Sequence, residues 1–190
     1  IFCSGKTTEQ VHFCIGSRGV SQLDDRKYDL AVIDTTLGGS MSSRLFQEIR
    51  ENRGLVYAIG SYSASYREGG LFAVYGGTSP ENLDEVVDLV RDEFANVLEN
   101  NITEEELARA KNQIRAALVL SLESMSSRMI RLAKSELYHG RIVPMEEVIG
   151  CIMNVTLDGV ARASKELFGD LRFPIAAIGP FNDRKEVTGQ

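Results

Sequence analysis

Residues 37–62 read LGGSMSSRLFQEIRENRGLVYAIGSY, and the repeat of apolar residues changes from helical to strand-like within this stretch. Its first half predicts a short helix that Ser42 or Ser43 can cap and that Gly54 ends. The apolar residues of this helix are spaced for one buried face: Leu45, Phe46 and Ile49. Residues 55–66 are rich in β-forming side chains and predict a strand. The stretch is therefore a helix-to-strand corner.

Downstream of the corner, the sequence predicts a hairpin and then a run of helices. REGG at 67–70 is a turn signal, and LFAVYGGT returns as a second strand. The expected helices are one capped by Ser79 with Pro80 at its first position, one opened by a capping box of Thr103 and Glu106, one over roughly 126–138 with Gly140 just beyond its end, a shorter one from Pro144, and one from Thr156 to near Phe168.

The two ends of the chain complete the predicted order of elements. Residues 9–19 alternate as a strand, and a helical pattern over 24–37 follows it. Residues 171–179 predict a closing strand, in which Pro174 favours an edge position or an irregularity. Strands and helices do not alternate regularly, so we expect an α+β fold with a mostly antiparallel sheet and helices packed on one face. We expect one domain over residues 1–190.

Composition excludes several classes of protein. A hydrophobic fraction of 43%, a charged fraction of 25% and a net charge of −6 are those of an ordinary globular chain and argue against a nucleic-acid partner. Neither a membrane-spanning stretch nor a signal peptide is visible. Three scattered cysteines indicate a reducing compartment, so we expect a cytoplasmic protein. The start at Ile1 rather than Met is consistent with a longer protein cut at this point.

Common catalytic and binding motifs fit this sequence poorly. The two histidines, His12 and His139, are far apart, and neither H-E-x-x-H nor H-x-x-E-H occurs, so a zinc site within this chain is not expected. SGKTT at 4–8 lacks the earlier glycine, and a strand rather than a helix follows it, so it is not a convincing phosphate loop. The serines lack a G-x-S-x-G motif, and capping or strand-surface roles suit them better: Ser42, Ser43, Ser61, Ser63 and Ser65.

Arg50 and Tyr57 form a different kind of candidate. Arg50 lies at the end of the short helix and Tyr57 at the start of the strand, so the Gly54 corner can bring both to one rim of the sheet. A phenol can donate to a carbonyl oxygen that gains negative charge, and a guanidinium can bind carbonyls or carboxylates. Spacing alone favours a structural role, in which Arg50 complements the helix C-terminus and Tyr57 packs.

The stretch 37–62 resembles the non-metal-binding half of the pitrilysin/insulinase family of zinc peptidases, particularly the bacterial homologues of mitochondrial processing peptidase. The resemblance covers nearly the whole chain through further matches: EQVHF, YGGTSPEN, ITEEELARAKNQIRAALVLSLES, VTLDGVARASKELF and AAIGPF. It implies that this chain is the second of two similar halves that face each other around a chamber.

The same resemblance implies roles for the candidate pair. In such enzymes the first half carries an H-x-x-E-H zinc helix, and the second half supplies an arginine and, seven residues on, a tyrosine. Arg50 and Tyr57 match that pair and its spacing, so Arg50 would position the substrate and Tyr57 would stabilise the oxyanion. Zinc would be the cofactor of the intact metalloendopeptidase, bound by the other half, and this chain alone would be inactive.

The partners implied are the N-terminal zinc-binding half and an extended peptide substrate, without nucleic acid or membrane, and a homodimer stays open. An alternative of another class is a non-catalytic structural or regulatory subunit of the same fold. Whether H-x-x-E-H occurs upstream of Ile1 distinguishes the two.

Overall fold

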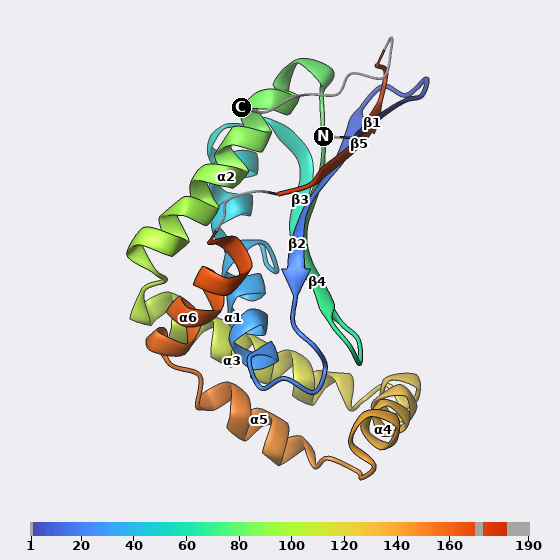
Figure 1. The fold of residues 1–190 in the computed structure, drawn as a ribbon, viewed down its shortest axis with the longest axis vertical. Helices are drawn as coiled ribbons and strands as arrows, with labels where there is room; N and C mark the ends of the chain where they lie inside the picture. The colour runs from blue at the N-terminus through green and yellow to red at the C-terminus, as the bar shows by residue number, and fades with distance from the viewer. Residues whose placement is uncertain (1, 170–172, 182–190) are drawn as a thin grey trace.

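A mostly antiparallel sheet organises the chain. The computed structural model describes residues 2–169 and 173–181, and within them the strands are β1 (Phe2–Gly5), β2 (Val11–Gly19), β3 (Val56–Ser65), β4 (Gly70–Thr78) and β5 (Ile175–Gly179). They lie in the order β1-β5-β2-β4-β3 (Figure 1). Only the β1–β5 pair is parallel among these strands. The predicted fold class is therefore confirmed.

The predicted hairpin is the β3–β4 pair. Its register runs from Val56 opposite Thr78 to Ser65 opposite Gly70, and the turn closes with a hydrogen bond from the Tyr66 amide to the Gly69 carbonyl at 2.7 Å. Because β3 has no partner on its other side among the described residues, it forms one edge of the sheet.

Helices cover one face of this sheet, as the sequence predicted (Figure 1). Their bounds are α1 (Lys27–Leu37), the π-helix η1 (Phe46–Asn52), the 3-10 turn η2 (Pro80–Asn82), α2 (Leu83–Asn100), α3 (Glu104–Ser121), α4 (Met125–His139), α5 (Met145–Met153) and α6 (Leu157–Phe168). The core between helices and sheet contains an aromatic cluster in which the rings of Phe94 and Phe168 stack with centroids 4.7 Å apart. The open face of the sheet carries exposed aromatic residues such as Tyr62 and Tyr75.

Several predicted helix ends are confirmed by their hydrogen bonds. Thr103 and Glu106 form the reciprocal capping box at the start of α3. Thr156 caps α6 by accepting from the Gly159 amide at 3.1 Å. Gly140 ends α4 with φ of 63°, a left-handed conformation that suits glycine.

Two predicted serine caps are wrong. Pro80 begins the 3-10 turn η2 and α2 begins only at Leu83, so Ser79 lies too far upstream to cap α2; its hydroxyl is buried without a hydrogen-bond partner among the described residues. Ser43 donates its hydroxyl to the Ser40 carbonyl at 2.6 Å rather than accepting from a helix amide, and Ser42 bonds the Ser40 hydroxyl.

The termini of the chain differ from the prediction in two further ways. β1 was not anticipated, because a four-residue strand at the chain end shows no alternating pattern long enough to recognise. Pro174 precedes β5, which begins at Ile175 and lies between β1 and β2 rather than at an edge. Residues 171 and 172 of the predicted closing strand lie outside the described residues. SGKTT spans the end of β1 and the loop to β2, without the helix that a phosphate loop requires.

Candidate functional site

The helix-to-strand corner is built by burial on one side and by a glycine at its apex. Leu45 and Ile49 are completely buried and anchor the helix, whereas Phe46 is only half-buried. Gly54 adopts φ of 65°, and the Gly54 and Leu55 amides donate to the carbonyls of Arg50 and Ile49 at 3.1 and 3.0 Å. These bonds end the helix and turn the chain into β3.

The helix of the corner is wider than expected. Residues Phe46–Asn52 form a π-helix rather than an α-helix. Isolated π-helical turns are uncommon and are frequent at functional sites, because the extra residue per turn changes where the following side chains point. The spacing of the buried residues could not reveal this, because Leu45 and Ile49 fit an α-helix equally well.

Arg50 lies on the exposed surface of η1. Its guanidinium carbon is 4.7 Å from the centroid of the Phe46 ring, a cation–π contact that holds the side chain over the helix. Arg50 makes no ion pair with any other described residue. Its position in the last turn fits a favourable interaction with the helix C-terminus, and its donors are free for a ligand.

Tyr57 lies at an irregular position on the edge strand. The β3–β4 register shifts between Val56 and Ala58, so Tyr57 is the extra residue of a bulge. Its side chain is 63% exposed and makes no side-chain hydrogen bond with the described residues. Bulges occur near active sites because they redirect one side chain. No hydrogen bond joins Tyr57 to Arg50 in the described part of the chain, and a catalytic role for either stays a prediction.

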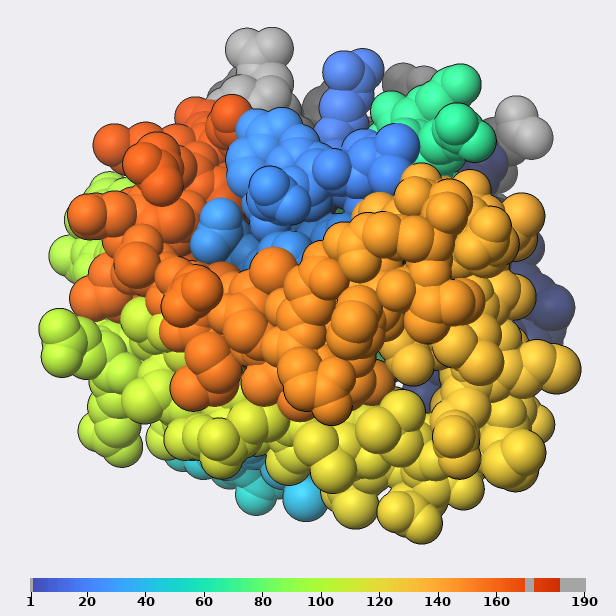
Figure 2. All heavy atoms as spheres, turned by 90° about the horizontal axis from the view of Figure 1, so that it is seen from below, coloured from blue at the N-terminus to red at the C-terminus, as the bar shows by residue number. Residues whose placement is uncertain are grey.

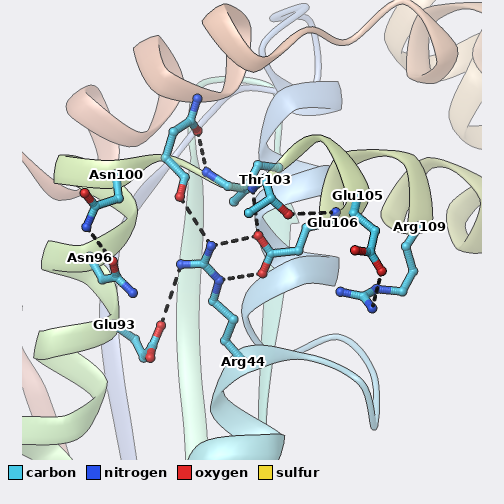
Figure 3. Close-up of polar contacts among 10 residues, drawn as sticks. Arg44, Glu93, Asn96, Asn100, Thr103, Glu105, Glu106 and Arg109 are labelled. Carbon is cyan, nitrogen blue, oxygen red and sulfur yellow. Dashed lines mark hydrogen bonds and ion pairs between the residues drawn. The ribbon is translucent and has the colours of Figure 1, made fainter.

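A half-buried arginine that the sequence did not single out, Arg44, anchors the start of this helix. Arg44 donates to both carboxylate oxygens of Glu106 at 2.7 and 2.8 Å and to the Asn101 carbonyl at 3.3 Å (Figure 3). Glu93 forms a longer ion pair with it at 3.8 Å. The sequence signal for Glu106 was its capping box, but its partner is 62 residues away and only the fold brings the two together.

The Glu106 carboxylate serves two structural purposes. It accepts from the Thr103 amide at 2.8 Å in the capping box and holds the Arg44 guanidinium. The hydrogen bonds from Arg44, more than any other effect, lower the pKa of Glu106 to about 2. Burial raises the pKa of Glu93, which Arg44 only partly offsets. Arg44 thus fixes the start of the helix that carries Arg50 to the junction between α2 and α3.

Asp34, in the last turns of α1, ties that helix to the edge strand. Its carboxylate accepts from the hydroxyls of Ser61 and Ser63 on β3, the latter at 3.2 Å. Burial raises the pKa of Asp34, and the serine hydrogen bonds oppose this rise. Ser61 is buried and Ser63 half-buried, so the prediction of strand-surface roles for these two serines is wrong.

The described residues do not fit a zinc ion. No group of three or more histidine, cysteine or acidic side chains is placed to hold a metal in residues 2–169 and 173–181. Within the same residues, no helix is both long and apolar enough to cross a membrane.

Comparisons with known proteins place the chain in a family. The family described as "Peptidase M16 inactive domain" matches residues 2–114. The uncharacterized zinc protease YmxG of Bacillus subtilis is 39% identical over 92% of this chain, and an uncharacterized zinc protease of Streptomyces coelicolor is 39% identical over 95% of it. The chain spans 42% and 39% of the lengths of these two relatives.

Solved structures share the fold. The peptidase M16 inactive domain from Pseudomonas fluorescens superposes with a TM-score of 0.84 at 24% identity, covering 96% of this chain and 44% of that one. A chain of complex III from Candida albicans superposes with a TM-score of 0.82 at 23% identity, covering 95% of this chain and 45% of that one. At these identities the likeness shows the fold alone. Together, the family match over residues 2–114 and the relatives at 39% identity show that this chain belongs to the peptidase M16 family, as its inactive domain.

Proposed function

We propose that the chain is the substrate-clamping C-terminal half of a zinc metalloendopeptidase that hydrolyses extended peptides. The observation that carries this proposal is the relationship, at 39% identity over almost the whole chain, to proteins named zinc proteases that are more than twice as long. Because the described residues hold no group of metal ligands, the ligands would come from the N-terminal half. Zinc bound there would activate water and polarise the scissile carbonyl.

The residues of this chain would act on the substrate from the opposite side. The Tyr57 phenol would donate a hydrogen bond to the carbonyl oxygen of the scissile bond as it gains negative charge. The Arg50 guanidinium would bind a substrate carbonyl or carboxylate and fix the peptide in position. The exposure of both side chains at one corner and their lack of other polar partners among the described residues support these roles.

Peptide cleavage by the full-length protein and by this chain tests the proposal. The full-length protein should cleave a fluorogenic, unfolded peptide, lose activity when a chelator removes the metal, and regain it with added zinc. This chain alone should show no turnover under the same conditions. A full-length protein that binds zinc but does not cleave a broad peptide library would contradict the proposal.

A non-catalytic structural or regulatory subunit is the second candidate. The occurrence of the same fold in a chain of complex III supports it, because the fold is then not confined to peptidases. An N-terminal half without H-x-x-E-H would favour this candidate. The three free cysteines fit the cytoplasm, which we propose as the location and which fractionation of source cells would test.

A further inference from the structure

Phe46 is the residue that holds the Arg50 side chain on the surface of η1. The guanidinium carbon of Arg50 lies 4.7 Å from the centroid of the Phe46 ring, and the two residues are four positions apart. Phe46 is half-buried and follows the fully buried Leu45, so the protein holds its ring in place, whereas Arg50 is exposed. The ring therefore presents a fixed surface to a long, flexible side chain.

This kind of contact orders a guanidinium without using its hydrogen-bond donors. A guanidinium over an aromatic ring is attracted through its face, while its five N–H groups point outward in its own plane. An ion pair with a carboxylate would also fix the side chain, but would occupy some of these donors. Arg50 makes neither an ion pair nor a side-chain hydrogen bond with another described residue. It is therefore ordered and available for a ligand at the same time.

The neighbours of Arg50 on the helix leave its charge unpaired. Side chains meet on a helix when they are three or four positions apart, or five in the wider π-helix. None of these positions around Arg50 holds an acidic residue: Leu45, Phe46, Gln47, Arg53, Gly54 and Leu55. The charged neighbour, Arg53, donates to Glu48 at 2.7 Å and pairs with Glu85 at 3.6 Å, which lowers its repulsion of Arg50.

The exposed position of Arg50 makes the contact with Phe46 important. A cavity of about 910 Å³ is lined by α1, α3, α4, α5 and the end of β3, and appears as a hollow between α4 and α5 in Figure 2, but η1 does not line it. Arg50 lies at the corner instead, on the exposed surface. A free arginine side chain loses rotamer entropy when a ligand fixes it, and one that is fixed beforehand loses less.

We propose that Phe46 is a positioning residue, which holds the Arg50 guanidinium in one orientation before a substrate peptide binds. Phe46 acts through Arg50 and does not itself contact the peptide. The inference rests on the substrate role proposed above for Arg50. It does not depend on cleavage, because it applies equally to a protein that binds peptide without hydrolysing it.

Peptide affinity tests the inference without turnover. The full-length protein, freed of metal by a chelator, should bind a fluorescently labelled unfolded peptide, and Arg50→Gln should raise the Kd. Phe46→Leu retains an apolar side chain but removes the ring, and should raise the Kd roughly two- to fivefold. Phe46→Tyr retains the ring and should leave the Kd unchanged. In the Arg50→Gln background, Phe46→Leu should have no further effect, because no guanidinium is left to hold.

NMR of the 190-residue chain tests the contact itself. Protons over the face of an aromatic ring resonate upfield, so the Arg50 side-chain signals, assigned by their loss in Arg50→Lys, should move downfield in Phe46→Leu. They should keep their positions in Phe46→Tyr. Circular dichroism should show the same folding in every variant, because both positions lie at the surface of η1.

Each contrary result has a distinct meaning. Unshifted Arg50 signals or an unchanged Kd in Phe46→Leu would overturn the inference. An equal rise of the Kd in the wild-type and Arg50→Gln backgrounds would also overturn it, because Phe46 would then act through packing alone. A Kd that does not respond to Arg50→Gln would overturn the role of Arg50 as well. The expected Kd pattern in a protein that cleaves no peptide would contradict the proposed peptidase function and support the role of Phe46.

Discussion

At the residue scale, the half-buried Arg44 fixes the start of the helix that carries the exposed Arg50. Its guanidinium connects the first turn of the corner helix to Glu106 on α3, while Arg50 lies six residues further along the same helix. The side chains of Arg44 and Glu106 are 17% and 14% exposed, so water screens their interaction weakly. The corner helix is therefore supported by a partly buried contact with α3.

Replacing Arg44 by methionine should reveal this support. Arg44→Met leaves the Glu106 and Glu93 carboxylates without their cation, and should lower the free energy of unfolding by roughly 2 kcal/mol or more. The matched control is Arg109→Met, which removes a surface pair with Glu105 and should change stability by less than about 0.5 kcal/mol. Urea unfolding followed by circular dichroism measures the free energy of unfolding of both variants. Equal losses in the two would show that the Arg44 contacts stabilise the fold no more than a surface ion pair does.

The pKa of Glu106 adds a pH dependence at the same scale. It lies at about 2 in the folded chain, below the ordinary 4.5, so the stabilisation is fully present above pH 4.5 and is lost as the pH falls toward 2. Glu106→Gln should therefore flatten the acid limb of the stability curve between these values. An unchanged acid limb in thermal melts over that range would contradict the assignment.

At the element scale, the Asp34 carboxylate connects α1 to the edge strand β3 through hydrogen bonds from Ser61 and Ser63. Burial makes this carboxylate harder to ionise. The pKa of Asp34 is raised, so ionising it costs the folded state more than the unfolded one, and stability falls as the pH rises through the folded pKa. Asp34→Asn retains groups that can bond Ser61 and Ser63 but cannot ionise. It should stabilise the chain at pH 7, with the gain vanishing below the ordinary carboxyl pKa. Destabilisation by the same amount at every pH would contradict this reasoning.

Sequence reasoning succeeded for elements whose cause is local. The hairpin, the capping box at Thr103 and the glycine at 140 each depend on residues a few positions apart, and the structure confirms them. The Arg44–Glu106 contact and the β1–β5 pairing depend on tertiary proximity, which periodicity does not contain. Ser79 does not cap α2 because a 3-10 turn, Pro80–Asn82, lies between them. Helix propensity does not distinguish a 3-10 first turn from an α-helical one.

The candidate site was predictable only in part. The residues alone favoured structural roles for Arg50 and Tyr57, and only the resemblance to a peptidase family favoured functional ones. The structure adds that Tyr57 is an exposed bulge residue on an edge strand and that Arg50 projects from a π-helix. Neither the bulge nor the π-helix is encoded in a short sequence pattern.

At the scale of the whole molecule, the chain spans less than half the length of the relatives that it matches. It corresponds to 39–42% of the lengths of its relatives in Streptomyces coelicolor and Bacillus subtilis, and the proposed reaction needs the remainder. The contact of Arg44 with Glu106 and that of Asp34 with Ser61 both lie within this chain, so neither requires a metal ion or a catalytic partner.

Turnover of peptide by the full-length protein carrying Tyr57→Phe tests the central claim most directly. Tyr62→Phe is the matched control, because Tyr62 is exposed on the same strand and loses the same hydroxyl. The account predicts that Tyr57→Phe lowers kcat about 10²-fold with little change in KM, the usual effect of removing one oxyanion donor, and that Tyr62→Phe leaves kcat unchanged. Wild-type turnover by Tyr57→Phe would contradict the account.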